Sequence, residues 1–204
     1  MVVSSKSNPL NILRGLLKKQ NGILSTSDLT TLGIPRTYLS ILEKNGEIQR
    51  VERGIYSSTA GELVDEMAVL QMRFHSAIFS HETALYLLNL TDRSPLFFSV
   101  TVPSGFNATS LKASGAKVYF VHRDVYSLGL TTMKSSHGNN LKTFNLERTI
   151  CDVARSRNQM DVQFVNQALK KYVNLRERNI NRLMGYAAQF GIQKIMREYI
   201  EVLL

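Results

Sequence analysis

The sequence predicts a mostly helical α+β protein in two domains, residues 1–60 and residues 61–204, and three observations support that fold class. Apolar residues recur at helical spacing in both halves of the chain, which favours amphipathic helices. Short runs rich in β-branched and aromatic residues stop at glycine or proline, which favours strands. The small residues at 57–61 separate the two parts and are typical of a domain boundary.

The first helix is expected to begin at Pro9 and to end before the Asn-Gly pair at 21–22. Asn8 can accept hydrogen bonds from the open backbone amides of the first turn, and proline suits the first helical position. Leucine and isoleucine residues follow at helical spacing. Two basic residues, Lys18 and Lys19, come at the far end of this helix.

A short second helix is predicted through Leu32, capped within the serine, threonine and aspartate run at 25–28. Gly33 provides a turn, and a third helix is predicted to begin at Pro35 and to close at the Asn-Gly pair at 45–46.

Two strands are predicted next, at residues 48–51 and 55–58, around a turn at 52–54. Gly54 is expected to leave the tip of this hairpin flexible.

Helix, short helix, tight turn, helix and hairpin, in that order, are the parts of a winged helix-turn-helix. If Leu39 and Leu42 face the core, the polar side chains of the third helix project from the other side, where they can reach base edges in the major groove. The hairpin arginines would then meet phosphates or the neighbouring minor groove. The predicted DNA-binding residues are Arg36, Thr37, Tyr38, Ser40, Lys44, Arg50, Arg53, Lys18 and Lys19. The alternative is a protein-docking module whose charges form a solvated surface.

The composition supports an anionic partner. The chain has 25 Lys and Arg against 16 Asp and Glu, a formal charge of +9 and a pI of about 9.8. A single cysteine excludes an internal disulfide and any zinc site with several cysteines. The start of the sequence lacks the apolar core of a signal peptide, and no apolar run approaches the roughly 18 residues of a membrane span, so a cytoplasmic location is expected.

The second domain is predicted to combine a small sheet with a helical C-terminal half. Ser80 and Asn145 are the expected caps of two helices, and Glu82 stands favourably in a first turn. The predicted strands are residues 97–102, which stop at Pro103, residues 117–121, and residues 139–143, whose pattern is weaker. The predicted helices are residues 63–73, 81–88, 146–155, 161–173, 176–190 and 193–203.

Basic residues gather late in the chain, with ten Lys and Arg against four Asp and Glu in residues 134–182. Arg178 and Arg182 are four positions apart, so they are expected to share one face of one helix. The residues of this candidate second basic surface are Lys170, Lys171, Arg178 and Arg182. Contact with DNA phosphate, contact with a partner and a solvated helix face all remain open.

The sequence predicts no catalytic, cofactor-binding or metal-binding residue. His81 and Glu82 are adjacent and therefore point about 100° apart on a helix. Glu147 and Asp152 are five positions apart and align poorly on one face, and Cys151 lies among apolar residues and is expected to be a small core residue. An enzyme, a nuclease or nucleotidyltransferase guided by the winged helix, is kept as the alternative function.

Several segments together resemble the AbiEi family. They are the N-terminal helix-and-hairpin pattern, "FSHETALYLLNL" at residues 79–90, "FFSVTVP" at residues 97–103 and "NLERTICDVAR" at residues 145–155. They occur in the order found in that family and span nearly the whole chain.

This resemblance implies an antitoxin of a bacterial abortive-infection toxin–antitoxin pair, commonly classed as type IV, in phage defence. By resemblance, the winged helix would bind inverted repeats in the operon promoter and repress it, which gives autoregulation. The second domain would counteract a nucleotidyltransferase-like toxin without requiring a stable complex. The expected species is a monomer in solution, with cooperative binding on DNA left open.

Overall fold

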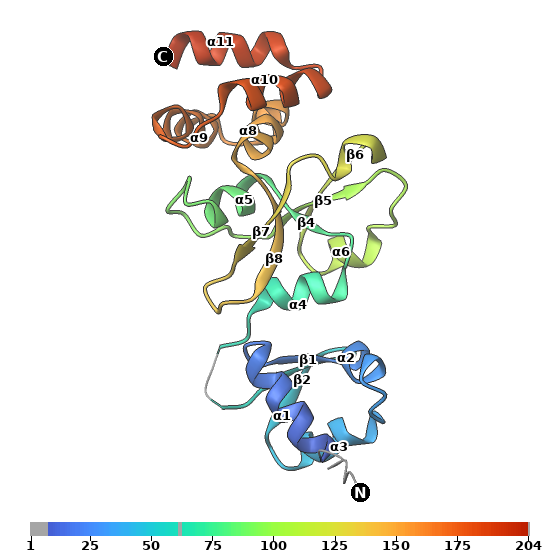
Figure 1. The fold of residues 1–204 in the computed structure, drawn as a ribbon. Coiled ribbons are helices and arrows are strands. Elements are labelled where there is room, and N and C mark those ends of the chain that lie inside the picture. The colour runs from blue at the N-terminus through green and yellow to red at the C-terminus, as the bar shows by residue number, and fades with distance from the viewer. Residues whose placement is uncertain (1–7, 61–62, 204) are drawn as a thin grey trace, which may run out of the picture. The chain divides into compact units, whose positions relative to one another are not determined.

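The computed structural model describes residues 8–60 and 63–203, and these residues form two compact units (Figure 1). Of the described residues, the N-terminal unit holds those up to His75 together with Ser135–Asn139, and the C-terminal unit holds the others. Each unit combines helices with a small sheet, so the predicted mixture of helix and sheet is confirmed. The start of the chain, from which the location was inferred, and Gly61 of the predicted boundary lie outside the described residues.

The N-terminal unit packs helices against a three-stranded antiparallel sheet with strand order β1-β3-β2. Its elements are α1 (Pro9–Lys19), β1 (Ile23–Ser25), α2 (Thr26–Thr31), α3 (Thr37–Lys44), β2 (Ile48–Glu52), β3 (Ile55–Ser58) and α4 (Glu66–Arg73). Strand β1 was not predicted, because three residues are too few to show an alternating pattern.

Local capping explains where these helices begin. The Asn8 side chain accepts a hydrogen bond from the Leu10 amide at 3.0 Å. Ser25 and Asp28 form a reciprocal capping box, in which the Ser25 amide donates to the Asp28 carboxylate at 2.7 Å and the Asp28 amide donates to the Ser25 hydroxyl at 3.2 Å. Helix α3 begins at Thr37, two residues later than predicted, because Pro35 lies in the turn before it.

The core of this unit is aliphatic. Its buried members come from α1, β1, α2, the turn between α2 and α3, α3 and β2, and they are Leu13, Leu24, Leu29, Ile34, Leu39, Leu42 and Ile48. Leu39 and Leu42 are thus on the inner side of α3, as the helical spacing predicted.

The C-terminal unit is built on a five-stranded mixed sheet with strand order β6-β5-β4-β8-β7. Its strands are β4 (Ile78–Phe79), β5 (Ser99–Pro103), β6 (Lys117–Val121), β7 (Leu130–Lys134) and β8 (Asn140–Phe144). Strands β4 and β8 pair in parallel, as do β5 and β6, and the other two pairs are antiparallel. The sequence predicted β5, β6 and β8. It missed β4, which has two residues, and β7, which is largely polar.

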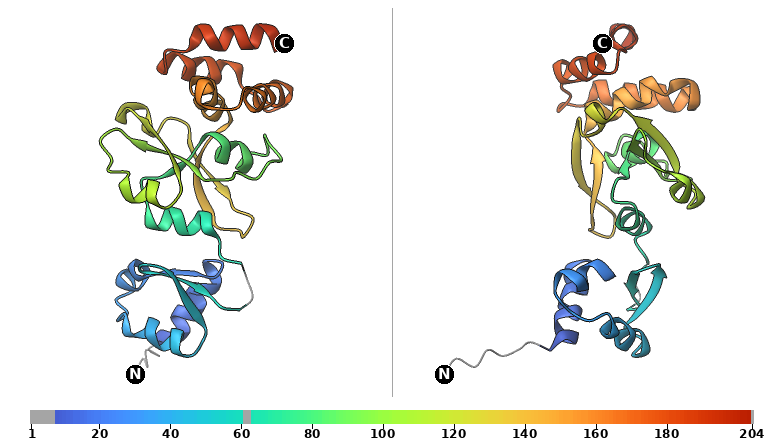
Figure 2. Two further views of the ribbon diagram at one scale, coloured as in Figure 1. Left: turned by 180° about the vertical axis from the view of Figure 1, so that it is seen from behind. Right: turned by 90° about the vertical axis from the view of Figure 1, so that its right-hand side faces the viewer.

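Helices α8 to α11 gather at one end of this unit (Figure 2) and contribute most of an apolar core there. The helices of the unit are α5 (His81–Leu87), α6 (Thr109–Ala113), α7 (Arg123–Tyr126), α8 (Leu146–Arg155), the 3-10 turn Arg157–Gln159, α9 (Val162–Asn174), α10 (Ile180–Gln189) and α11 (Gln193–Leu203). Asn145 caps α8 as predicted, accepting a hydrogen bond from the Arg148 amide at 3.0 Å.

Two further predicted helix starts and one predicted cap need correction. Helix α4 begins at Glu66, because the Asp65 side chain caps it through the Ala68 amide. Ser80 occupies the cap position of α5 but makes no capping hydrogen bond, since its hydroxyl instead contacts the side chains of His81 and Thr101. Helix α10 begins at Ile180 rather than at residue 176.

Candidate nucleic-acid interface

Helix α3 presents polar side chains on the side opposite its buried leucines. Arg36, Thr37, Ser40 and Lys44 are exposed, and Tyr38 is half-buried against the core. Among the described residues, the side chains of Arg36 and Lys44 form no ion pair. The surface of α3 therefore carries cationic and hydroxyl groups that are free to contact a ligand.

The β2–β3 hairpin carries two exposed arginines. Arg50 precedes a register shift in the β2–β3 ladder, and its Nε atom donates to the Glu52 carbonyl at 3.3 Å. Arg53 lies at the hairpin turn. Glu52 forms an ion pair with Arg73 of α4 at 2.7 Å, which offsets the acidic charge beside the two arginines.

The hairpin tip is fixed, which corrects the expectation of flexibility at Gly54. The Thr26 amide, at the start of α2, donates to the Gly54 carbonyl at 2.8 Å. A Cβ atom at position 54 would lie 2.8 Å from the Thr26 hydroxyl, and the φ of +77° is one that residues with side chains rarely adopt. Glycine is thus needed here for a close approach that holds the hairpin to α2.

An ion pair that the sequence did not indicate joins α1 to the turn after α3. Arg14 donates through Nε and a terminal nitrogen to the two carboxylate oxygens of Glu47, at 2.7 and 2.8 Å. The hydrogen bonds from Arg14 and then from Asn45 lower the pKa of Glu47 to about 2. Glu47 is therefore neutralised by a partner rather than left to repel an anion.

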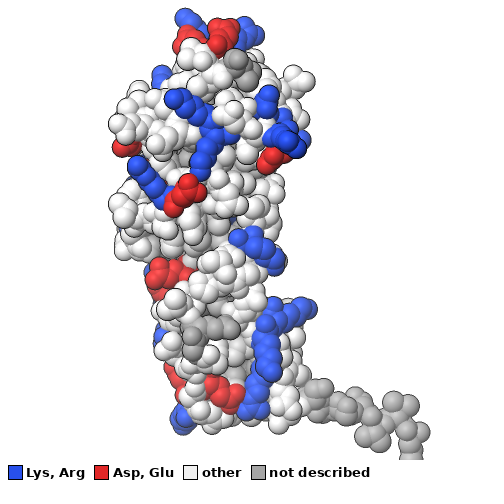
Figure 3. Space-filling model, turned by 90° about the vertical axis from the view of Figure 1, so that its left-hand side faces the viewer, with Lys and Arg blue, Asp and Glu red and all other residues white. Residues whose placement is uncertain are grey.

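Lys18 and Lys19 lie exposed in the last turn of α1, where cations also offset the negative end of the helix dipole. They follow Arg14 by about one turn, and Arg14 contacts Glu47 in the turn after α3. Figure 3 shows a run of Lys and Arg side chains over one side of the N-terminal unit.

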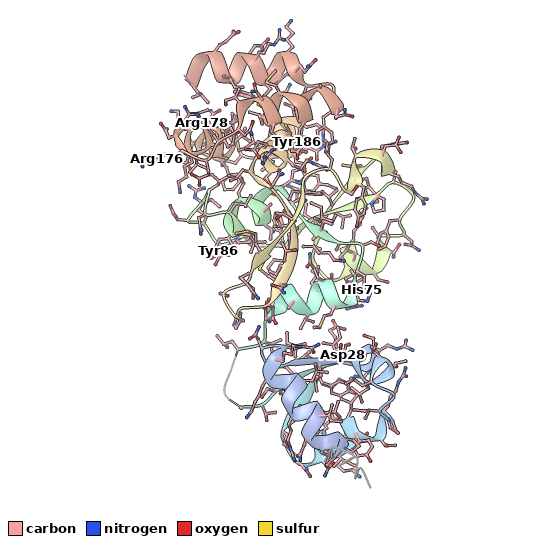
Figure 4. All side chains as sticks on the ribbon, viewed as in Figure 1. Asp28, His75, Tyr86, Arg176, Arg178 and Tyr186 are labelled. Carbon is pink, nitrogen blue, oxygen red and sulfur yellow. The ribbon has the colours of Figure 1, made fainter. Side chains whose placement is uncertain are left out.

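The four residues of the candidate second basic surface do not form one helix face. Asn179 caps α10 by accepting from the Arg182 amide at 2.9 Å, so Arg178 precedes the helix that contains Arg182. Arg178 donates instead to the Leu175 carbonyl at 3.0 Å, in the connection after α9 (Figure 4). The prediction of a shared face for Arg178 and Arg182 is therefore wrong.

The other members of that set have different surroundings. Arg182 lies 3.4 Å from the buried carboxylate of Glu147. Lys170 and Lys171 are exposed near the end of α9, and Lys171 pairs with Asp92 at 3.1 Å.

Of the residues considered for catalysis, His81, Glu147, Cys151 and Asp152 are buried, and Glu82 is partly exposed and pairs with Lys117. The His81 ring lies between the hydroxyls of Ser80 and Ser156, at 2.9 and 3.0 Å, and stacks on Tyr119. Burial, followed by the positive charges of Arg155, Lys117 and Arg148, holds the pKa of His81 well below its usual value.

Asp152, Glu147 and Cys151 also have structural roles. Asp152 pairs with Arg148 and Arg155, and Glu147 accepts from the Asn179 amide. Cys151 is a buried core residue, as predicted, and burial raises the pKa of its thiol to about 12. Within residues 8–60 and 63–203, no three His, Cys, Asp or Glu side chains are grouped so that they could hold a metal ion.

A crystal structure of the RV2827C protein from Mycobacterium tuberculosis is similar to this chain, with a TM-score of 0.59 and 14% sequence identity. The match covers 87% of this chain and 70% of that one, and it shows a shared fold. No curated protein sequence matches the chain significantly. In the described part of the chain, no helix is long and apolar enough to cross a membrane.

One family profile matches residues 11–59, which run from α1 to the end of the β2–β3 hairpin. It describes a transcriptional regulator, the AbiEi antitoxin. The resemblance to the AbiEi family that the sequence indicated is thereby confirmed over these N-terminal residues.

Proposed function

We propose that this protein is a transcriptional repressor of the AbiEi type, which binds double-stranded promoter DNA through a winged helix-turn-helix at residues 1–60. Residues 61–204 are the antitoxin domain, which counteracts a nucleotidyltransferase-like toxin. The proposal is supported by the family match to residues 11–59 and by the order of α2, turn, α3 and hairpin.

The proposed DNA binding is supported mainly by the polar outer surface of α3. Arg36 and Thr37 stand at the N-terminal end of α3, which is the end that a recognition helix directs at base edges. An arginine can donate two hydrogen bonds to guanine, and threonine offers both a hydroxyl and a methyl group that can meet thymine. Ser40 follows one turn later, and Lys44 another turn beyond it, towards the phosphates.

The hairpin is a suitable wing because it is held in place before DNA arrives. Arg50 and Arg53 have no carboxylate partner among the residues that the structure describes. The hydrogen bond from Thr26 to Gly54 connects this hairpin to the first turn of α2. In the proposal these two arginines contact backbone phosphate, and α3 reads the bases.

The antitoxin part follows from the family and from the presence of a second folded unit. The C-terminal unit has its own sheet and its own apolar core, so it can carry an activity that does not require DNA. Repression of its own operon through inverted repeats would then regulate the amount of antitoxin.

Footprinting on the DNA upstream of the gene tests this function. The full-length protein should protect specific sequences arranged as inverted repeats and leave the DNA uncut in the presence of Mg²⁺. Metal-dependent cleavage of the same DNA would favour the enzyme instead. Uniform protection without sequence preference would reject the repressor.

A further inference from the structure

A hollow in the C-terminal unit combines positive charge with an apolar floor. It has a volume of about 500 Å³ and lies between α9 and the loop after α5. Arg93 and Asp92 line it from the loop, and Lys170 and Lys171 line it from the helix. Phe164 is partly exposed and contributes apolar surface, whereas Leu90 is a core residue that is 2% exposed, and we refer to these six residues as the basic hollow.

The charge of the basic hollow is only partly neutralised. Three cationic side chains face one carboxylate, and the single ion pair joins Lys171 to Asp92 at 3.1 Å. The Asp92 side chain is 95% exposed, so water and salt screen this pair and it costs little to open. Arg93 and Lys170 form no ion pair in the ranges that the structure describes.

A second hollow of about 300 Å³ adjoins the first, and the two share Leu90, Lys170 and Lys171. Asn89 and Asn174 also line the second hollow and add amide groups. The two lysines therefore line both hollows, and a ligand that places its charge beside them can extend to either side.

The end of α9 does not cancel this positive charge. A helix C-terminus carries partial negative charge on its free carbonyl groups. Here the Asn174 side chain donates to the Lys170 carbonyl at 2.8 Å, and Arg178 donates to the Leu175 carbonyl at 3.0 Å. Two carbonyls at the helix end thus already have partners. The electrostatic potential of the hollow is therefore determined by its charged side chains.

We propose that the basic hollow binds a nucleoside phosphate, either a free nucleotide or the end of a nucleic-acid strand. Lys170, Lys171 and Arg93 hold the phosphate groups, because ammonium and guanidinium groups form charge-assisted hydrogen bonds to phosphate oxygens. The base lies on the partly exposed ring of Phe164. A volume of about 500 Å³ lies in the range of small-molecule sites.

This site is independent of the proposed DNA-binding surface, since it uses no residue of the N-terminal unit. The hollow contains Lys170 and Lys171 but not Arg178 and Arg182, although the sequence analysis grouped all four. It also contains Arg93, which the sequence analysis did not identify.

The test is a calorimetric titration of the full-length protein with ADP, inorganic pyrophosphate and a 5′-phosphorylated oligoadenylate. ADP should bind, and Lys170→Glu combined with Lys171→Glu should weaken its binding by at least about tenfold, or about 1.4 kcal/mol. Asp92→Asn should strengthen binding, because Asp92 is the only carboxylate among the described residues that line the hollow. Lys194→Glu is the control for a charge reversal outside the hollow, because this exposed α11 residue does not line it; it reverses one charge, as Arg93→Glu does, where the double variant reverses two.

Each outcome decides something. Tighter binding of the oligoadenylate than of ADP identifies a strand end as the ligand, and the reverse identifies a free nucleotide. Pyrophosphate binding as tight as ADP binding would overturn the role of the apolar floor. The site itself is rejected if neither ADP nor the oligoadenylate binds, or if Lys194→Glu weakens binding as much as the double variant does.

Loss of ligand binding can be distinguished from loss of folding and from loss of promoter binding. If the double lysine variant does not fold, Arg93→Glu replaces it, because Arg93 is an exposed loop residue. Promoter footprints should be unchanged in all hollow variants. If the parent protein gave no footprint, the proposed ligand site would therefore stand. If the titration showed no binding, the proposed repressor function would stand.

Discussion

Helix α3 and helix α8 both carry charged and hydroxyl side chains, but α3 presents them to solvent whereas α8 buries them. Arg36 and Lys44 have no ion pair among the described residues. Arg148 of α8 is fully buried and donates to Asp152 at 3.0 Å and to the carbonyls of Val125 and Leu128 at 2.7 Å. A count of charges cannot separate these cases, because burial decides whether a charge is available to a ligand or already has a partner.

The packing around Arg148 shows how strongly α8 depends on its charges. The guanidinium lies over the rings of Phe144 and Phe190, at 4.1 and 4.5 Å from their centroids. A Cβ atom on Gly129 would come within 2.6 Å of the Arg148 Cβ atom. The segment "ERTICD", which supports the family resemblance, is therefore a set of packing and pairing residues in this structure.

The largest effect is expected from Arg148→Ala. Removing one partner of a buried pair costs about 3–5 kcal/mol, because Asp152 keeps a buried charge with only Arg155 beside it. Urea unfolding gives the free energy, with Arg36→Ala as the comparison, which should stay within about 0.5 kcal/mol of the parent. Similar small changes in both variants would remove the contrast between the two helices.

Arg36→Ala should have the opposite profile, with a loss in DNA binding rather than in stability. If Arg36 reads guanine, the variant loses about 1–3 kcal/mol on the operator and less on random DNA. Fluorescence anisotropy with both DNAs measures this, and Lys194→Ala serves as a control away from α3. Equal losses on both DNAs would make Arg36 a phosphate contact.

The buried His81 side chain is expected to make the stability of the fold depend on pH. Because the pKa of His81 is lowered on folding, the unfolded chain binds the extra proton first as the pH falls. The contribution of neutral His81 is complete above about pH 6.5 and is lost below it, by at most about 1.4 kcal/mol per pH unit for one proton.

The unfolding free energy of the parent and of His81→Asn, measured between pH 7.5 and 5, separates this group from others. Asparagine is chosen because position 81 has a φ of +49°, which asparagine tolerates better than most residues. Parallel curves for the two proteins would assign the acid sensitivity to other groups.

The smallest expected effect concerns the hairpin. Replacing Arg50 or Arg53 by alanine should reduce the slope of log affinity against log salt by about one unit, on any DNA sequence. The change in affinity at one salt concentration is modest by comparison. Unchanged slopes in both single variants would exclude the hairpin from the interface.

Local signals made much of the fold predictable. Asn8, the 25–28 run and Asn145 were identified as caps, because a cap depends only on the next few residues. The outward side of α3 followed from the spacing of Leu39 and Leu42.

The failures came from short elements and distant contacts. Strand β4 has two residues and depends on pairing with β5 and β8, which no local pattern reveals. Arg14 and Glu47 are 33 positions apart, so their pairing required the fold. Arg178 and Arg182 were placed together because their spacing fits a helix, although Asn179 between them is the cap that separates them.

The hydrogen bond between Thr26 and Gly54 has a thermodynamic consequence for the proposed repressor. A wing that is ordered in the free protein has already lost its conformational entropy, so DNA binding need not include that cost. Calorimetry should then show a heat-capacity change that matches the area buried by rigid surfaces, without the excess that accompanies coupled folding. The hydrogen bond between Thr26 and Gly54 would thus let DNA bind to a preformed hairpin, without folding of the hairpin on binding.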